Sequence, residues 1–491
     1  MHQLEPWHHN ITSPYAQALV IPLFKETRKL EDIWKSATTA FYENNPSQGK
    51  ILVILVFNAP SNATEAALSN TQTALFNLNK KRKLSYSAAP FEFSEQHHYD
   101  LLTMDFTYPG ICPKQGVGYA RKLGADVACW LFYHQKIKHP FLNCTDADVT
   151  LPMDYFTSSM DHSRCINHHS LYKDEPSNSS SNNPKQIAAF IQAFTHEPIN
   201  KTKTNAIETN EISVNETQIP RDYLHLANTQ IIIAHRYYEL YLRHLVANLA
   251  LCNSPYAYHS IGSLLKINLT AYAQVRGFPK RAAGEDFYLL NKLAKVGSIK
   301  TLNTTAISIS PRLSDRTPFG TGPQVTELLV FSSETRHNSG CLYPSANYIE
   351  FLKSKPYFYA PECFRLLKSL LSRVEHFGNE QEIIEHLSKS AMPEVLFQSI
   401  ISGLRSTQRI SKNSASFVKH FHQWFDGFRT MKWLNLASRV FQKVKLQDAF
   451  TREWLEKLEQ DSCTKEEFKH NSLEISRLLA KIERHPMKKH S

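Results

Sequence analysis

Two short apolar segments near the N-terminus constrain the fold of this chain more than any other feature. They are Ala18–Phe24 (ALVIPLF) and Ile51–Phe57 (ILVILVF), and the second is far shorter than the roughly 20 residues needed to span a bilayer. Uninterrupted apolar runs of this length are typical of strands buried on both faces of a sheet. Residues 28–42 between the runs and residues 63–78 after them have helical spacing. The order strand, helix, strand, helix predicts an α/β fold with a mostly parallel sheet.

The same alternation continues through the first two thirds of the chain. We expect further strands at 101–106, 141–145 and 260–268, and further helices at 116–134, 229–252 and 287–295. Polar segments rich in Asn, Ser and Thr interrupt this pattern at about 173–222. We interpret that region as an insertion of two loops around one short helix, IAAFIQAF at 187–194.

Strand-like runs fade after about residue 325, and helical stretches dominate the remainder. The sequence therefore predicts a first domain at 1–325, which carries the polar insertion, and a helical C-terminal region at 326–491. The formal net charge of the chain is +11. Residues 331–491 hold 25 basic and 18 acidic residues and so contribute +7 of it. The basic, aromatic stretch 416–445 is either a helix that packs its aromatic face inward or a surface for an anionic membrane or a charged acceptor.

Several classes of protein are excluded or disfavoured by motifs that the sequence lacks. Its eight Cys form no C-x-x-C pair, which argues against a zinc ribbon or a thioredoxin-like site. No nucleic-acid-binding motif accompanies the diffuse positive charge, so we expect no nucleic-acid partner. The polar N-terminus does not resemble a signal peptide. We therefore expect a cytoplasmic protein, with peripheral contact at the inner membrane face as the alternative.

An acidic pair follows the strand expected at 141–145. Asp146 and Asp148 are spaced to reach one divalent cation as the chain turns, and oxygen ligands suit Mg²⁺ or Mn²⁺. The carboxyl ends of strands are also where open α/β sheets bind ligands. A polar turn with a capping Asp is the alternative interpretation of the same residues.

A second acidic pair, Glu285-Asp286, begins the helix expected at 287–295. Acids at this position complement the helix dipole, and they could equally supply a general base at the mouth of a site. Gly116-Val117-Gly118 precedes another helix and could present N–H groups to a phosphate, although it is neither a P-loop nor a full G-x-G-x-x-G motif.

The order of these motifs resembles that of family 2 glycosyltransferases, which have the GT-A fold. VIPLFKE, VFNAPSN, GVGYARKLG, NCTDADVTLP and AYAQVRGFPKRAAGEDFYLLNKLAK follow one another as the family's motifs do, over roughly residues 15–320 outside the insertion. The resemblance implies a Rossmann-like, mixed and mostly parallel sheet flanked by helices. It also implies transfer of a sugar from a nucleotide-sugar donor to the hydroxyl of a glycan, lipid-linked or small-molecule acceptor.

The resemblance also implies roles for individual residues of the nucleotide pocket. Pro22 and Glu26 match the first-strand motif that lines this pocket. Asn58 matches an Asp that contacts the base in the family, and Arg121 matches the Arg of the ARN motif beside the nucleotide. Asn58 can donate as well as accept hydrogen bonds, so this replacement leaves the base preference open.

The remaining roles concern the metal, the acceptor and the chemistry. Asp146 and Asp148 match the D-x-D that holds Mn²⁺ or Mg²⁺ on the donor diphosphate, and Gly277-Phe278 matches a stretch near the acceptor pocket. Asp286 matches the base that deprotonates the acceptor, with Glu285 beside it; one base suffices for an inverting displacement. A His metal ligand common in relatives is missing from ISISPR at 307–312.

Arg312 and Arg316, followed by Gly320 and Gly322, could close over the diphosphate as a lid; the alternative is a basic surface loop. Two other functions remain open from the sequence. The chain could be a non-catalytic nucleotide-binding relative of the same fold. The letters DADVT also match the nucleophile motif of haloacid-dehalogenase-like phosphatases, in which Asp146 would attack phosphate.

Overall fold

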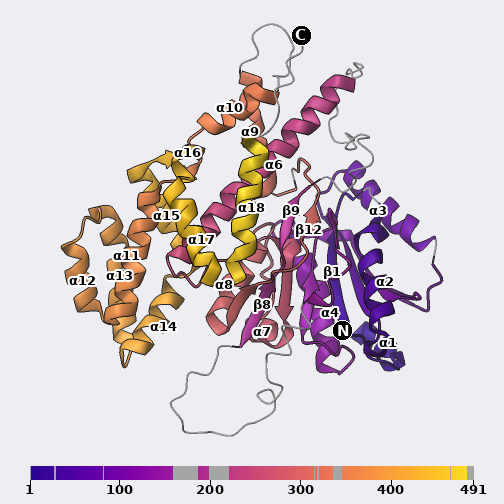
Figure 1. Cartoon of the computed structure of the whole chain (residues 1–491). Coiled ribbons are helices and arrows are strands. Elements are labelled where there is room, and N and C mark those ends of the chain that lie inside the picture. Colours follow the sequence, from indigo (N-terminus) through magenta and orange to yellow (C-terminus); the bar gives the residue numbers. More distant parts are fainter. Residues whose placement is uncertain are drawn as a thin grey trace. The chain divides into compact units, whose positions relative to one another are not determined.

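The computed structural model describes residues 2–26, 29–80, 82–158, 186–197, 221–314, 316–317, 320–334, 345–464 and 466–483. The chain divides into two compact units, which are coloured along the sequence in Figure 1. The first unit comprises residues 1–203 and 260–322, and the second comprises 204–259 and 323–491. Segment 204–259, which we expected in the first domain, is thus part of the second unit.

A nine-stranded mixed sheet organises the first unit, with the strand order β11-β8-β10-β6-β1-β2-β5-β4-β3. Strands β4 and β10 are antiparallel to both of their neighbours, so the other seven strands share one direction. The strands are β1 (Gln17–Leu23), β2 (Ile51–Pro60), β3 (Tyr86–Ala88), β4 (Phe91–Glu95), β5 (Tyr99–Ile111), β6 (Phe141–Cys144), β8 (Ile187–Ile191), β10 (Leu265–Asn268) and β11 (Ser298–Thr301).

Helices flank this sheet and bury its central strands. Every residue of β1 and the first nine residues of β2 are buried, as expected for strands covered on both faces. The helices of the first unit are α1 (Glu5–Asn10), α2 (Lys35–Asn44), α3 (Glu65–Asn79), α4 (Gly116–Tyr133), α7 (Leu269–Gln274) and α8 (Glu285–Val296). Helix α4 packs on β1 and β2, and α8 packs on β8 and β11. The α/β class with a mixed, mostly parallel sheet is therefore confirmed, in agreement with a GT-A arrangement.

The register of the parallel strands brings three loops to one edge of the sheet. Leu23 at the end of β1 pairs with Phe57 of β2, and Cys144 at the end of β6 pairs with Val20 of β1. Because parallel strands end at the same edge, the residues that follow β1, β2 and β6 lie together there.

A small sheet of three strands, in the order β7-β12-β9, lies beyond this edge. Its strands are β7 (Val149–Thr150), β9 (Phe194–His196) and β12 (Ile307–Ile309). The backbone N–H of Ser310 donates to the carbonyl of Asp148 at 2.8 Å, which continues the β7–β12 pairing. This pairing fixes the segment after β12 beside the D-x-D residues.

The expected helix at 187–194 is wrong, because this segment forms β8 and part of β9. Its apolar residues pair with β10 on one side and with β11 on the other, so the run is a buried strand of the main sheet. Strand pairing of residues far apart in sequence thus overrides the local helical pattern. The polar segments expected as loops at 173–185 and 198–220 lie outside the described residues.

The second unit is mainly helical, as expected for the C-terminal region, with one short two-stranded sheet of β13 (Phe358–Tyr359) and β14 (Lys443–Val444). Its helices are α6 (Arg221–Leu251), α10 (Ser345–Ser354), α11 (Pro361–Phe377), α12 (Glu380–Ser388), α13 (Glu394–Ile410), α14 (Ser414–Trp424), α15 (Gly427–Phe441), α16 (Leu446–Ala449), α17 (Arg452–Thr464) and α18 (Glu466–Glu483). The first two residues of helix α9 (Thr321–Glu334) belong to the first unit, and the rest of the helix belongs to the second.

The aromatic stretch at 416–445 is two helices rather than one. The break falls at Asp426, whose side chain accepts a hydrogen bond from the backbone N–H of Arg429 at 3.1 Å and so caps α15. Phe417, Phe421 and Trp433 are buried in the core of this unit, so most of its aromatic side chains pack inward. Among the described residues, no helix is long and apolar enough to cross a membrane.

Candidate functional site

A buried arginine links three segments at the sheet edge. Arg121 of α4 is 3% exposed, and its guanidinium donates to Glu285 at 2.8 Å, to the carbonyl of Gly262 at 3.0 Å and to Asp146. Burial alone would lower the pKa of Arg121, but Asp146 and Glu285 raise it overall. Arg121 is therefore a permanent cation that fixes the D-x-D and the Glu-Asp pair relative to each other.

Close backbone packing places Arg121 at this point. Gly118 donates its N–H to the carbonyl of Arg281 at 3.0 Å, and a Cβ at Gly118 would lie 2.5 Å from the carbonyl oxygen of Pro279. The start of α4 can therefore lie directly against the segment that leads into α8. Because this N–H is already bonded within the protein, the glycine pair serves packing rather than the phosphate contact that the sequence left open.

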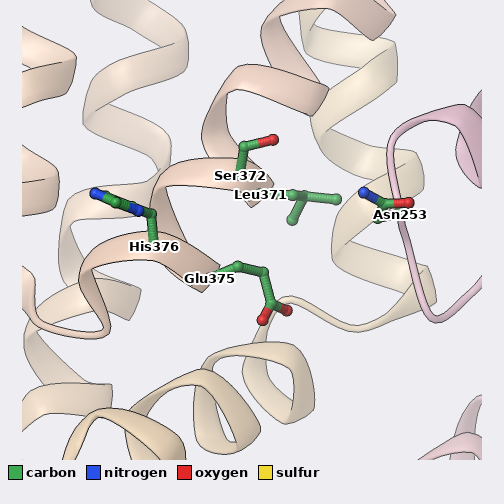
Figure 2. A pocket seen from close by; sticks show the side chains of 5 residues that line it. All are labelled: Asn253, Leu371, Ser372, Glu375 and His376. Carbon is green, nitrogen blue, oxygen red and sulfur yellow. The ribbon is translucent and has the colours of Figure 1, made fainter.

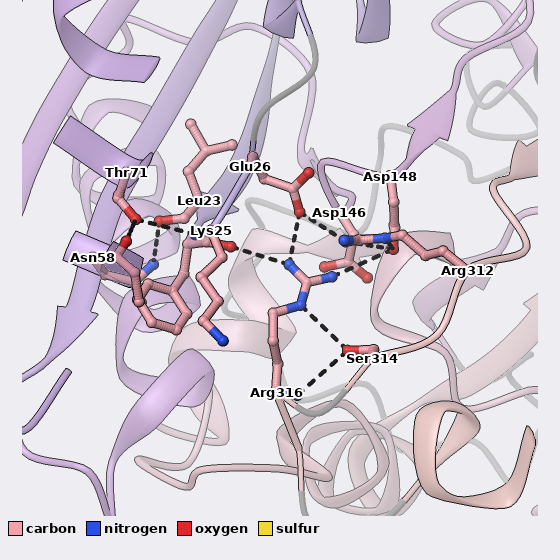
Figure 3. A network of polar contacts seen from close by, with 12 residues as sticks. Leu23, Lys25, Glu26, Asn58, Thr71, Asp146, Asp148, Arg312, Ser314 and Arg316 are labelled. Carbon is pink, nitrogen blue, oxygen red and sulfur yellow. Dashed lines mark hydrogen bonds and ion pairs between the residues drawn. The ribbon is translucent and has the colours of Figure 1, made fainter. Parts of the chain in front are cut away.

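Figure 3 shows a second network at the same edge, in which two arginines meet two acids. Arg312 donates to Glu26 at 2.8 Å and to Oδ2 of Asp148 at 3.1 and 3.2 Å. Arg316 donates to Glu26 at 2.7 Å and to the carbonyl of Phe24 at 3.2 Å, and it lies 3.6 Å from Asp148. The expected lid residues thus meet the expected nucleotide-pocket and metal residues.

The ends of β1 and β2 form the third part of the site. The side-chain amide nitrogen of Asn58 donates to the carbonyls of Leu23 at 3.1 Å and Val56 at 3.2 Å. Its two hydrogens are thereby engaged, and the remaining amide atom, Oδ1, can only accept. Pro22 is buried in β1, where it pairs with Val56, and so it shapes the strand rather than presenting a polar group.

The two acids that begin α8 have different surroundings. Glu285 is 4% exposed and paired with Arg121; burial raises its pKa, and Arg121 opposes that rise. Asp286 is half-buried and accepts a hydrogen bond from the N–H of Phe287 at 2.7 Å. Burial and the neighbouring charge of Glu285 raise the pKa of Asp286 to about 7. Asp286 can therefore exchange a proton near neutral pH.

The expected acceptor residues follow α7. Gly277 has φ = +67°, and its carbonyl accepts a hydrogen bond from Lys292 at 2.7 Å. Phe278 is 2% exposed and packs against Tyr272, with 5.9 Å between the ring centroids. The described contacts of both residues are thus internal to the fold, and their role toward an acceptor stays a prediction.

The donor set at the sheet edge suits a divalent cation only in part. Among the described residues, no group of three or more His, Cys, Asp or Glu side chains is arranged to hold a metal ion. Asp146 and Asp148 each have one oxygen bonded to an arginine, and the described contacts leave the other oxygen without a hydrogen bond. The pair can therefore supply two hard oxygen ligands, and the rest would have to come from a substrate diphosphate and water.

The comparisons with known proteins concern fold alone. No protein-family model and no curated protein match this chain, whereas nine chains of known structure do. One is TarS 1–349 of S. aureus, at 10% identity and a TM-score of 0.31, covering 87% of this chain and 91% of that one. Another is the mannosyltransferase PcManGT from Pyrobaculum calidifontis in complex with GDP-Man and Mn²⁺, at 10% identity and a TM-score of 0.26, covering 96% and 88%. Because both TM-scores are below 0.5, these likenesses support no functional argument. The proposed function therefore rests on the site itself.

A pocket of about 340 Å³ opens in the second unit, and Figure 2 shows the side chains that line it. Asn253, Leu371, Ser372, Glu375 and His376 surround this pocket. Glu375 is bonded to His422 at 2.8 Å. The lining lacks the paired acids and arginines of the sheet edge, so we assign no chemistry to it.

Gly262 is the site residue that the sequence did not reveal. Its carbonyl accepts from Arg121, and a Cβ at this position would lie 2.2 Å from the Arg121 guanidinium. The local signal is only a glycine in a polar stretch before a strand, which many loops share. Its role follows from its contact with Arg121, which is 141 positions away in the sequence.

Proposed function

We propose that this chain is a family 2-like glycosyltransferase that moves a sugar from a nucleoside-diphosphate donor to an acceptor hydroxyl. The observation that carries the proposal is the Arg121 network. It joins the D-x-D after β6 to the acids that begin α8, although these motifs lie more than 130 residues apart in sequence. A site for diphosphate thus lies beside a carboxylate whose pKa is near neutral.

The diphosphate end of this site would be built from Asp146, Asp148 and the two lid arginines. A bound Mn²⁺ or Mg²⁺ would neutralise charge on the leaving diphosphate. Glu26 and Asp148 hold Arg312 and Arg316 at this edge by ion pairs. We infer that a diphosphate competes with these carboxylates for the two guanidiniums, because phosphate oxygens accept the same bidentate hydrogen bonds.

The base end would be set by Asn58. Both of its N–H groups are bonded to backbone carbonyls, so it can offer only an acceptor to a nucleotide. The ring N–H of uracil or guanine can donate to this acceptor, and so can the exocyclic amino group of cytosine or adenine, so Asn58 alone does not select the base. Asn58 would then accept a hydrogen bond from the base as the family's Asp does, and the donor is a nucleoside-diphosphate sugar.

Asp286 would accept the proton of the acceptor hydroxyl as the sugar is transferred. A single base and no covalent intermediate imply an inverting reaction. Glu285 and Arg121 would act as positioning residues, since both are buried and bonded to each other. The acceptor is a glycan, a lipid-linked sugar or a small molecule, and the Gly277–Phe278 turn would adjoin it.

The alternatives fit the same contacts less well. Haloacid-dehalogenase-like phosphatases usually carry the nucleophile motif after their first strand, whereas Asp146 follows β6, and β1 and β2 precede it in the same sheet. A non-catalytic nucleotide binder would have no need of an acid held near neutral pKa, as Asp286 is. We therefore consider both alternative functions less well supported than glycosyl transfer.

Calorimetric titration of nucleoside diphosphates tests the proposal. At least one of UDP, GDP, CDP and ADP should bind the full chain more tightly with Mn²⁺ than without it, because the metal bridges the acids and the diphosphate. Asp148→Ala should remove the Mn²⁺ increment, because it removes one of two protein ligands. Asp32→Ala, an exposed acid in the same unit, serves as the matched control.

Two outcomes of this titration would contradict the proposed function or its metal site. If no nucleoside diphosphate or sugar nucleotide binds with or without Mn²⁺, the proposed function is wrong. If Asp148→Ala keeps the full Mn²⁺ increment, the nucleotide assignment stands and the metal assignment fails.

A further inference from the structure

From residue 395 onward, the exposed charged side chains of α13, α14 and α15 are all basic, although Glu394, an exposed acid, begins α13. Residues 395–447 contain nine Lys and Arg and a single acid, Asp426, which is buried as the cap of α15. All nine basic residues are exposed: Arg405, Arg409, Lys412, Lys419, Arg429, Lys432, Arg439, Lys443 and Lys445. Among the ion pairs that the structure describes, only Arg405 of this set has an acidic partner, Glu380 at 3.5 Å.

Helix α15 presents the clearest part of this surface. Phe428, Lys432, Asn435 and Arg439 follow one another at helical spacing and are exposed, so they form one face. Arg429 and Val440 extend the same face to one side. The opposite face buries Trp433, Leu434 and Ala437 in the core of the unit. The exposed face of α15 therefore mixes cations with apolar side chains and has no acid.

The apolar members distinguish two kinds of anionic partner. Phe428 is 38% exposed, Val440 is 43% exposed and Ile410, at the end of α13, is 63% exposed. A soluble polyanion, such as a nucleic acid, would gain little from the aliphatic Val440 and Ile410, because its binding energy comes from phosphate contacts and from base stacking on aromatic rings. A lipid surface accepts both kinds of group, since anionic headgroups attract the cations and the boundary with the acyl chains takes the apolar side chains.

We propose that the exposed face of α15, with the neighbouring cations of α13 and α14, binds the surface of an anionic membrane. Both the positive charge and the apolar side chains of this face match the surface of such a membrane. Each Lys or Arg near such a surface is attracted to the anionic headgroups, and the attraction falls off within a Debye length. The contact is peripheral, and it would hold the protein at a membrane independently of the sheet-edge site.

Co-sedimentation of the full chain with lipid vesicles tests this proposal. The chain should bind vesicles that contain phosphatidylglycerol far better than vesicles of phosphatidylcholine alone, and high salt should release it. The triple variant Arg429→Glu, Lys432→Glu, Arg439→Glu should weaken binding by about a hundredfold or more, since each cation contributes several-fold. The control Lys80→Glu, Lys83→Glu, Lys114→Glu changes the net charge equally, from exposed positions of the first unit, and should bind as the wild type does.

The variant Phe428→Ser separates the lipid from a soluble polyanion. It leaves the charge unchanged, so weaker vesicle binding would support insertion at the membrane boundary. Vesicle binding that both triple variants weaken alike would overturn the proposal, because net charge alone would then explain it. Binding of heparin without binding of anionic vesicles would overturn it in favour of a soluble polyanion. If the α15 triple variant does not fold, the salt dependence of vesicle binding and the Phe428→Ser variant still test whether this face binds a membrane.

Discussion

At the scale of single residues, two adjacent acids have become chemically different. Glu285 is buried against Arg121, so its charge is neutralised within the protein. Asp286 has no comparable partner among the described contacts, and it lies beside the charge of Glu285. Environment rather than residue type therefore separates a structural carboxylate from a carboxylate that can act as a base near pH 7.

Turnover should follow the ionisation of Asp286. A base must be deprotonated, so the rate of nucleoside diphosphate release from a sugar nucleotide should rise with pH up to about 7 and then level off. The variant Asp286→Asn should bind the donor normally and lose roughly a hundredfold or more in rate, in the range typical of a lost general base. Asp448→Asn, an exposed acid of the second unit, is the control. A near-normal rate for Asp286→Asn would move the base to another residue.

At the scale of elements, backbone contacts decide where the motifs meet. Helix α4 begins against residues 279–282, and the turn at Gly262 allows the Arg121 guanidinium to lie on its carbonyl. These approaches leave no space for a side chain. The local geometry of the site is therefore a property of how helices and turns contact the sheet edge, and small residues there are required by packing.

A methyl group at Gly262 tests this packing. The added Cβ would lie 2.2 Å from a guanidinium that Asp146 and Glu285 also hold, so Gly262→Ala should lower the free energy of unfolding by about 1–3 kcal/mol. Urea unfolding of the chain measures the change. The same substitution in an Arg121→Ala background should cost markedly less, because the clashing group is gone. Equal costs in the two backgrounds would show that the strain has another source.

At the scale of the whole molecule, the chain forms two compact units. The second unit is stabilised by a continuous apolar cluster drawn mainly from α11, α13, α14 and α15, with Leu367 of α11 fully buried. Its helices have alternating buried and exposed positions at helical spacing, so each contributes one face to that cluster. This explains why the positive charge of the region gathers on its outer surface.

The variant Leu367→Ala should destabilise this unit by about 2–5 kcal/mol through the cavity it leaves. Hydrogen exchange of peptides from 361–377 measures the effect locally and should show faster exchange than in the wild type. Leu473→Ala, at a position 49% exposed, should change stability by less than about 0.5 kcal/mol. Unchanged protection after Leu367→Ala would mean that α11 is not central to this core.

Much of the first unit could be predicted from the sequence, because its strands and helices have strong local patterns. The runs that form β1 and β2, the spacing of α4 and the end of α8 at Gly297 all agree with the structure. The segment at 187–194 was misassigned, since its helical appearance competes with pairing to β10 and β11. The hairpin of β3 and β4 was not foreseen, because its strands are only three and five residues long.

The sequence by itself determined the fold class and the identity of the acids and arginines that could do chemistry, since strand periodicity and motif order are local properties. Only the tertiary structure decided that Arg121 is a buried link between Asp146 and Glu285, and that Arg312 and Arg316 lie on Glu26 and Asp148. The physical reason is that charges shift one another's pKa and engage one another's hydrogen bonds only over a few ångströms. Distances of that size between residues far apart in sequence are set by strand register and helix packing.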